Sequence, residues 1–117
     1  MKIAGVQHVS IGVHDVDAAI AFYALLGMTV VPTRPDFGVP GAWLQTGGQQ
    51  VHLIQTDKTT PGLENHFALI VDDLEACLAE LAPHGINAFR LPPARGAGKQ
   101  GFINDPSGNV VELNQPD

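Results

Sequence analysis

An internal repeat is the feature that most restricts how this chain can fold. The segment beginning at His8 (HVSIGVHDVDAAIAFYALLGMTV) resembles the segment beginning at His66 (HFALIVDDLEACLAELAPHGINA), 58 residues later. Both segments have Asp at their eighth position and Gly at their twentieth. A further match, at an offset of 60 residues, aligns His52 with Glu112 between similar apolar neighbours. A tandem repeat of this length predicts two copies of one structural unit.

Each copy has the pattern of one strand and one helix followed by three strands. Asp15 and Asp73 are suited to cap the helices, and Gly27 and Gly85 to terminate them. In the first copy, we predict strands over 6–13, 28–33, 41–46 and 49–55 and a helix from Val16 to the residues before Gly27. In the second copy, we predict strands over 66–71, 86–91, about 100–104 and 109–114 and a helix over 74–82.

These elements predict an α+β fold made of two tandem βαβββ modules within a single domain, residues 1–117. Module 1 covers about residues 1–56 and module 2 about residues 65–117. The polar segment 57–64, which contains Pro61-Gly62, is the expected linker.

Composition excludes several classes of partner and location. The 6 Lys and Arg against 12 Asp and Glu give a net charge of −6, so we expect no nucleic-acid partner. No apolar run reaches the ~20 residues that span a bilayer, and the N-terminus lacks a signal-peptide pattern, so we expect no membrane association. Cys77 is the sole cysteine, which excludes an internal disulfide and fits a reducing, cytoplasmic location.

Four residues that commonly bind metals occupy equivalent places in the two copies. Because side chains alternate along a strand, each lies opposite the aliphatic side chains, as His52 does between Val51 and Leu53. A single such histidine is usually structural, but four at repeat-equivalent positions favour a metal site. Three imidazoles and one carboxylate suit Zn, Ni, Fe or Mn and exclude calcium, which requires oxygen ligands. The predicted metal ligands are His8, His52, His66 and Glu112.

Other residues of similar chemistry have more ordinary explanations. His14 and His84 fall at a helix start and in the turn after a helix, so we expect both at the surface. Cys77 lies within the apolar pattern of the second helix, so we expect it in the core.

The sequence resembles the vicinal oxygen chelate superfamily over nearly its whole length, most specifically in HVSIGVHDVDAAIAFYALLGM, NHFALIVDDLEACLAEL and DPSGNVVEL. This superfamily includes glyoxalase I, methylmalonyl-CoA epimerase, extradiol dioxygenases, and fosfomycin- and bleomycin-resistance proteins. The resemblance implies paired βαβββ modules whose curled mixed sheets surround a divalent metal at the four candidate positions. It also implies a small-molecule substrate whose two adjacent oxygens are held by the metal, which acts as a Lewis acid.

The ligand types separate the reactions of the superfamily. His52 stands where glyoxalase I proteins have Glu and the epimerase has Gln, so epimerisation with two bases is disfavoured. Glu112 is the one carboxylate among the four, at the position of the base in glyoxalase-like isomerases. We therefore expect a lyase or isomerase of glyoxalase type with Glu112 as the catalytic residue.

Two other functions stay open. An Fe(II) extradiol-type dioxygenase would use His8, His66 and Glu112 and would require His52 to move or to fill a substrate position. A metal-free protein that binds a drug, as bleomycin-resistance proteins do, would normally lack the ligand set.

The sequence indicates the substrate-contact residues and the oligomeric state less directly than it indicates the metal ligands. The cationic candidates for a substrate acid group, and the aromatic candidates for a cavity wall, each have a simpler explanation as surface or core residues. The small size of the chain favours burial of further surface in a homodimer, which the resemblance also implies. The linker allows the metal site to form within one chain or between two chains. The candidate contact residues are Arg34, Arg90, Arg95, Lys99, Phe37, Trp43 and Phe102.

Overall fold

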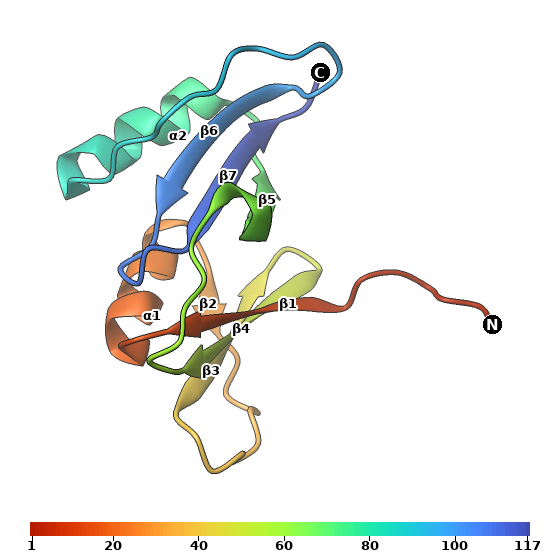
Figure 1. Cartoon of the computed structure of the whole chain (residues 1–117), viewed down its shortest axis with the longest axis vertical. Coiled ribbons are helices and arrows are strands. Elements are labelled where there is room, and N and C mark those ends of the chain that lie inside the picture. The colour runs from red at the N-terminus through yellow and green to blue at the C-terminus, as the bar shows by residue number, and fades with distance from the viewer. The chain divides into compact units, whose positions relative to one another are not determined.

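The computed structural model describes residues 1–117 and divides into two compact units. Unit 1 spans Met1–Thr59 and unit 2 spans Thr60–Asp117. Each unit contains one α-helix packed against a small mixed sheet, which confirms the predicted α+β fold (Figure 1). No helix has the length and apolar character needed to cross a membrane.

The sheet of unit 1 has the strand order β1-β4-β3-β2. Its first and last strands, β1 and β4, pair in parallel, whereas β3 pairs antiparallel with both β4 and β2. Helix α1 provides the crossover from β1 and packs against β3 and β4. The elements are β1 (His8–Val13), α1 (Val16–Leu25), β2 (Thr29–Val30), β3 (Gly41–Thr46) and β4 (Gln49–Gln55).

Local sequence signals account for these elements. The Asp15 side chain accepts a hydrogen bond from the Ala18 amide at 3.1 Å, which caps α1. Gly27 ends the helix region with a φ of 85°, a conformation that glycine adopts at little cost. The apolar side chains of β3 and β4 alternate with polar and aromatic ones, so one face of the sheet is buried against α1. The opposite face presents Trp43 and His52.

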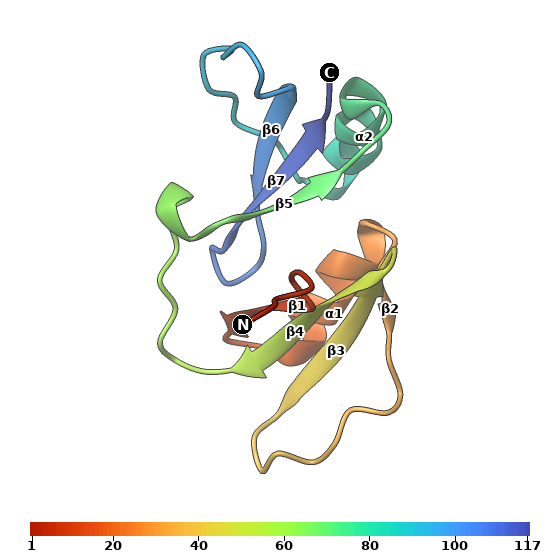
Figure 2. The same cartoon turned by 90° about the vertical axis from the view of Figure 1, so that its right-hand side faces the viewer.

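The sheet of unit 2 has the strand order β5-β7-β6, with β5 and β7 parallel and β6 and β7 antiparallel (Figure 2). Asp73 caps its helix through a hydrogen bond from the Ala76 amide, which is the counterpart of the cap in unit 1. The elements are a short 3-10 turn (Leu63–Asn65), β5 (Phe67–Ile70), α2 (Leu74–Leu81), a second 3-10 turn (Ala82–His84), β6 (Lys99–Asn104) and β7 (Val110–Gln115).

The predicted strand over 86–91 is wrong. Only Phe89 makes a bridge there, exchanging backbone hydrogen bonds with Phe102 at 2.9 and 3.0 Å. The side chain of Arg90 then donates to the Gln100 carbonyl at 2.7 Å, and Pro92 and Pro93 have no N–H to extend a ladder. The second predicted strand of unit 2 is therefore reduced to one residue.

Two further predictions need correction. The strand predicted over 28–33 is shortened to Thr29–Val30, since Pro32 cannot donate to its neighbour. Cys77 is partly exposed on α2 and not in the core, whereas Leu74 and Leu81 are the buried side chains of that helix.

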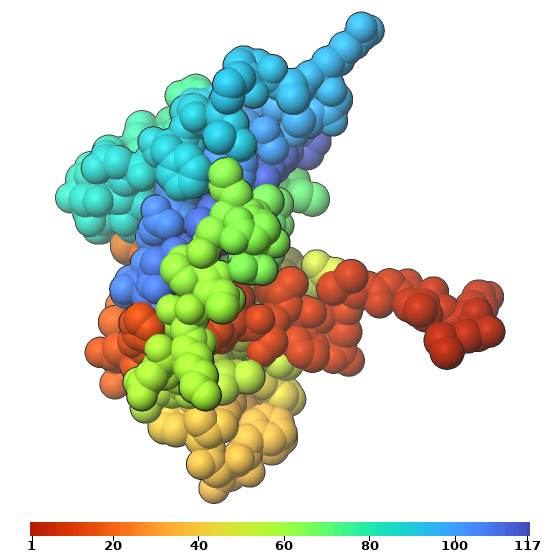
Figure 3. Space-filling view, in the orientation of Figure 1, coloured from red at the N-terminus to blue at the C-terminus, as the bar shows by residue number.

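Residues 1–7 extend away from the sheet of unit 1 as an exposed segment (Figures 1 and 3). One contact ties the segment to the β3–β4 hairpin, because the Gln49 side-chain amide donates to the Val6 carbonyl at 3.0 Å. The last residues of the segment therefore keep a defined position next to the start of β1.

The backbone at the start of β3 leaves no room for a side chain at Gly41. A Cβ at Gly41 would lie 2.2 Å from the Leu53 carbonyl oxygen and 2.6 Å from the Arg34 guanidinium, so Gly41→Ala must push β4 or Arg34 aside. We expect this variant to lose about 1–3 kcal/mol of unfolding free energy in a denaturant titration. Gly48→Ala, in the turn of the same hairpin, is the control because nothing lies within 4 Å of its Cβ. Equal stability of both variants would contradict the packing described at Gly41.

Candidate metal centre

The four predicted ligands form two pairs, one in each unit, with the same strand register. In unit 1, His52 on β4 pairs with Ser10, two residues beyond His8 on β1. In unit 2, Glu112 on β7 pairs with Ala68, two residues beyond His66 at the start of β5. Parallel pairing of the first and last strands therefore places one donor diagonally from the other in both units.

The pair in unit 2 is in direct contact. His66 Nε2 lies 3.1 Å from Glu112 Oε1. Glu112 is 5% exposed, and a buried carboxylate requires compensating partners. Two donors bound to one metal at ~2.0–2.2 Å lie roughly 2.9–3.5 Å apart at tetrahedral or octahedral angles. The separation of this pair is within that range.

A second contact of His66 shows which of its two ring nitrogens carries the proton. Its Nδ1 hydrogen-bonds the Leu63 carbonyl oxygen, which can only accept, so Nδ1 carries the proton. In the neutral ring, Nε2 then has a lone pair that faces the carboxylate of Glu112, which also only accepts. Two acceptors at this distance require a proton or a metal cation between them.

The other oxygen of Glu112 is held by two side-chain amides. Asn114 Nδ2 donates to Oε2 at 2.6 Å and Gln100 Nε2 donates to it at 3.3 Å. Asn114 Nδ2 also donates to the Ala97 carbonyl at 2.9 Å. Such outer contacts fix the orientation of a ligating carboxylate and leave Oε1 toward His66.

The pair in unit 1 is a stack of rings. The His8 and His52 rings are nearly parallel with centroids 3.8 Å apart, and Trp43 stacks on His52 at 4.4 Å and 7°. His8 Nδ1 donates to Gln7 Oε1 at 2.9 Å, so His8 Nε2 keeps a lone pair. The stack orients both imidazoles on the face of the sheet opposite α1.

A chain of amides fixes the orientation of His52. Gln45 Nε2 donates to the carbonyls of Gly47 and Gln49, which leaves Gln45 Oε1 to accept from Gln50 Nε2 at 3.3 Å. Gln50 Oε1 therefore faces His52 Nε2 at 2.8 Å, and this nitrogen donates. Consequently, Nδ1 is the nitrogen of neutral His52 with a free lone pair.

The surroundings also favour neutral His52. Burial lowers the pKa of this imidazole, and the neighbouring His8 ring and the guanidinium of Arg34 lower it further. A neutral imidazole is the form that binds metals.

For Cys77, burial raises the pKa of the thiol, with added effects of Glu80, Asp73 and Asp72, so the thiol stays protonated.

Neither unit contains three or more His, Cys, Asp or Glu side chains grouped as a metal site. The structure thus brings the predicted ligands together as His8 with His52 and as His66 with Glu112. His14 and His84 are exposed and belong to neither pair.

A cavity of about 350 Å³ in unit 1 adjoins the first pair. Aromatic and aliphatic side chains form most of its wall, and Arg34 is its one permanently charged group. It is lined by Gln7, His8, Ser10, Arg34, Phe37, Val39, Trp43, His52, Leu53 and Ile54.

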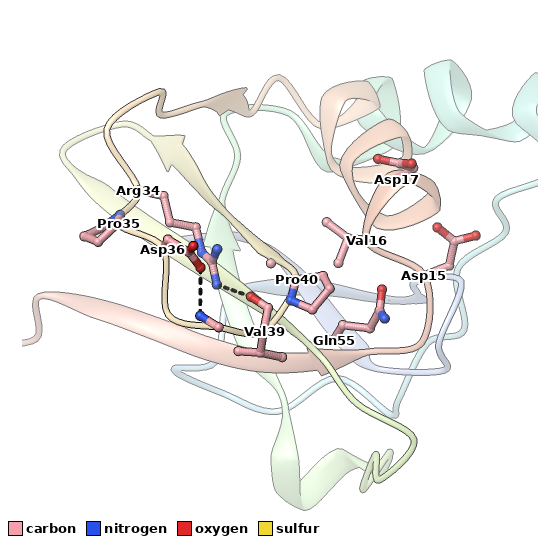
Figure 4. Close-up of a pocket in the computed structure, with 11 residues that line it drawn as sticks. Asp15, Val16, Asp17, Arg34, Pro35, Asp36, Val39, Pro40 and Gln55 are labelled. Atoms are coloured by element: carbon pink, nitrogen blue, oxygen red, sulfur yellow. Dashed lines mark hydrogen bonds between the residues drawn. The ribbon is translucent and has the colours of Figure 1, made fainter.

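A second cavity of unit 1, about 750 Å³, lies between the start of α1 and the segment 34–41 (Figure 4). Arg34 donates to the Val39 carbonyl at 3.1 Å and Asp36 accepts from the Gly38 amide at 2.8 Å, so the polar groups of this segment largely serve its own backbone. None of the predicted metal ligands lines this cavity.

The other predicted contact residues differ in their surroundings. Arg90 is engaged, with a hydrogen bond to the Gln100 carbonyl and an ion pair with Glu75 at 3.0 Å. Arg95 and Lys99 are exposed. Phe102 is buried and makes an edge contact with the His66 ring at 5.6 Å, so it supports that candidate ligand.

Sequence reasoning missed the residues that orient the candidate ligands. Gln50 and Asn114 each stand two positions from a candidate ligand on the same strand, so strand alternation could have identified them. Gln100 reaches Glu112 only through the register of β6 with β7, which a single sequence does not reveal.

Comparisons with known proteins identify the family of this chain. Residues 5–113 match the model of the Glyoxalase/Bleomycin resistance protein/Dioxygenase superfamily. The glyoxalase domain-containing protein RDO1 of Mycosarcoma maydis is 30% identical over 97% of this chain and 69% of its own length. TnmS3, an antibiotic binding protein from Streptomyces sp. CB03234, is 29% identical with a TM-score of 0.77, covering 100% of this chain and 99% of its own.

A structure of lower identity has the same fold. A mutant of the fosfomycin resistance protein FosX from Listeria monocytogenes, in complex with Mn(II) and 1S,2S-dihydroxypropylphosphonic acid, is 15% identical with a TM-score of 0.86. The alignment covers 99% of this chain and 95% of that one. On the evidence of the family model and of RDO1, this chain belongs to the Glyoxalase/Bleomycin resistance protein/Dioxygenase superfamily.

Proposed function

We propose that this protein is a metal-dependent enzyme of glyoxalase type, a lyase or isomerase that acts on a small substrate with two adjacent oxygens. The proposed ligands of its divalent metal are His8, His52, His66 and Glu112, and the proposed catalytic residue is Glu112.

The contact between His66 and Glu112 carries this proposal. A histidine lone pair and a carboxylate oxygen, both acceptors, face each other at 3.1 Å, with a cation or proton needed between them. On the side away from this contact, His66 donates from Nδ1 to the Leu63 carbonyl, and Glu112 accepts from Asn114 at Oε2. This arrangement of donors fits a divalent metal.

The donor set also fits the metals predicted from the sequence. Three imidazoles with one carboxylate suit Zn, Ni, Fe or Mn, and the hydrogen bonds of His8 and His52 leave each ring one free lone pair. When bound, the metal supplies Lewis-acid stabilisation of the negative charge that develops on the substrate oxygens.

Glu112 supplies the proton transfer in this proposal. Its Oε1 removes a proton from the substrate carbon beside the two oxygens, holds it, and returns it to the neighbouring position, so no other reactant is consumed. Asn114 and Gln100 keep the carboxylate in one orientation during both transfers.

A second candidate, metal-free binding of a small molecule, is favoured by one observation. The cavity of about 350 Å³ is mainly aromatic and aliphatic, as expected of a binding pocket, and the similar protein TnmS3 is an antibiotic binding protein. Measurement of metal content separates this function from the first. Oxygen uptake with catechols separates both from the extradiol-type dioxygenase, which uses Fe(II).

We further propose that the protein is a homodimer, as expected for a small chain with a modest core. The two donor pairs then come either from one chain or from two chains of the dimer. Both alternatives use the same four residues.

Loading with metal tests the ligands directly. We expect protein purified without chelators to bind one Zn, Ni, Fe or Mn ion per chain, measured by elemental analysis and calorimetry. His66→Ala and Glu112→Ala should each weaken binding by at least the ~10–100-fold that is typical for loss of a contact around a metal site. The control is His84→Ala, since His84 is exposed and outside both pairs. Failure to bind any of these metals would reject the metalloenzyme.

The role of Glu112 as base is tested by Glu112→Gln, which keeps the size and an oxygen donor but removes the basicity. With α-ketoaldehyde–thiol adducts as substrates, we expect turnover to fall by at least about 10²-fold. Glu80→Gln, an exposed change on α2, should leave turnover unchanged. Turnover by Glu112→Gln at the unmodified rate would show that Glu112 is not the base.

The assembly is tested by mixing two inactive proteins, His8→Ala/His52→Ala and His66→Ala/Glu112→Ala, after unfolding and joint refolding. If the sites form between chains, roughly half of the dimers are mixed and each regains one intact site, restoring part of the metal binding and turnover. If the sites form within chains, neither returns. A monomeric sedimentation coefficient at micromolar concentration would contradict the dimer.

A further inference from the structure

The cavity of about 350 Å³ in unit 1 has a charge that differs from the protein as a whole. The chain has a net charge of −6, yet no Asp or Glu lines this cavity. Arg34 is its one permanently charged side chain. A cavity with one guanidinium and no carboxylate favours an anionic ligand.

Arg34 is held in place and keeps free donors. It is half-buried, its Nη2 donates to the Val39 carbonyl at 3.1 Å, and its guanidinium carbon lies 5.1 Å from the centre of the Phe37 ring. The missing side chain of Gly41 allows this close approach to the backbone of β3. A guanidinium has five N–H donors, so most remain for an acid group.

The rest of the wall suits a flat ring. Trp43 and Phe37 lie 6.2 Å apart with their planes tilted by 41°, and Val39 and Ile54 add aliphatic surface. Phe37 is 59% exposed, so much of its ring surface is open to a ligand. A planar aromatic ligand that packs against these rings binds more tightly than its buried area alone would give.

We propose that this cavity binds an aromatic carboxylic acid, with its ring against Trp43 and Phe37 and its carboxylate on Arg34. The volume is near the lower end of the ~300–1,000 Å³ range of small-molecule sites, which limits the ligand to one or two rings. Because His8 and His52 line the same cavity, this inference rests on the proposed function and names its substrate class as aryl-substituted acids.

The sole tryptophan provides a direct readout of binding. Trp43 gives one indole N–H resonance in a ¹H–¹⁵N spectrum, so a titration reports on this cavity without metal or turnover. Titrations with benzoate, cyclohexanecarboxylate and benzamide separate the contribution of the ring from that of the charge. We expect benzoate to shift the resonance saturably and to bind at least about tenfold more tightly than either analogue.

Three variants complete the experiment. Arg34→Gln should weaken benzoate binding by roughly ten- to a hundredfold, as for a lost charge-assisted hydrogen bond, and should leave benzamide unaffected. Phe37→Leu should remove the preference for benzoate over cyclohexanecarboxylate and carries the test if Arg34→Gln does not fold. Lys58→Gln, at an exposed lysine that does not line the cavity, should bind benzoate as the unmodified protein does.

The outcome is independent of the metal experiment. Saturable benzoate binding that depends on Arg34 supports the cavity even if no metal binds, in which case only the enzymatic function fails. Equal binding of benzoate and cyclohexanecarboxylate, an unchanged affinity in Arg34→Gln, or no shift of the indole resonance with benzoate would overturn the inference, whatever metal the protein holds.

Discussion

Parallel pairing between the first and last strand of each unit is the constraint on which the rest of this structure depends. Parallel strands cannot be joined by a tight turn, so the chain must leave the sheet and return, and α1 and α2 begin that crossover. The helix then covers one face of the sheet. The other face is left for the side chains that alternate with the core, and the candidate ligands stand there.

The same pairing explains why the chain carries two similar donor pairs. His52 lies opposite Ser10 and Glu112 lies opposite Ala68, so each pair is set by the same diagonal across two parallel strands. The chemistry of the pairs nevertheless differs. The histidine rings of unit 1 stack with each other and with Trp43, whereas unit 2 joins one imidazole to a buried carboxylate.

Much of the fold could be predicted because the repeat, the helix caps and strand alternation are local signals. Asp15 and Asp73 cap their helices as the sequence indicates, and β3 and β4 have the predicted bounds. The apolar pattern of 86–91 does not show that this segment fails to form a strand. The side chain of Arg90 bonds the Gln100 carbonyl, and the two prolines that follow have no N–H for strand pairing. The partners of the candidate ligands depend on register, as Gln100 shows, and register is a tertiary property.

Asn114 connects the candidate site to a surface loop through hydrogen bonds. One side-chain amide joins Glu112 to the Ala97 carbonyl, which belongs to the Gly- and Pro-rich loop before β6. Gly98 makes this close approach possible, because a Cβ there would lie 2.9 Å from Asn114 Oδ1. Because the same amide makes both hydrogen bonds, a change in the position of Ala97 would also change the contact that orients the carboxylate. Asn114 therefore couples the orientation of Glu112 to the position of a surface loop far from it in the sequence.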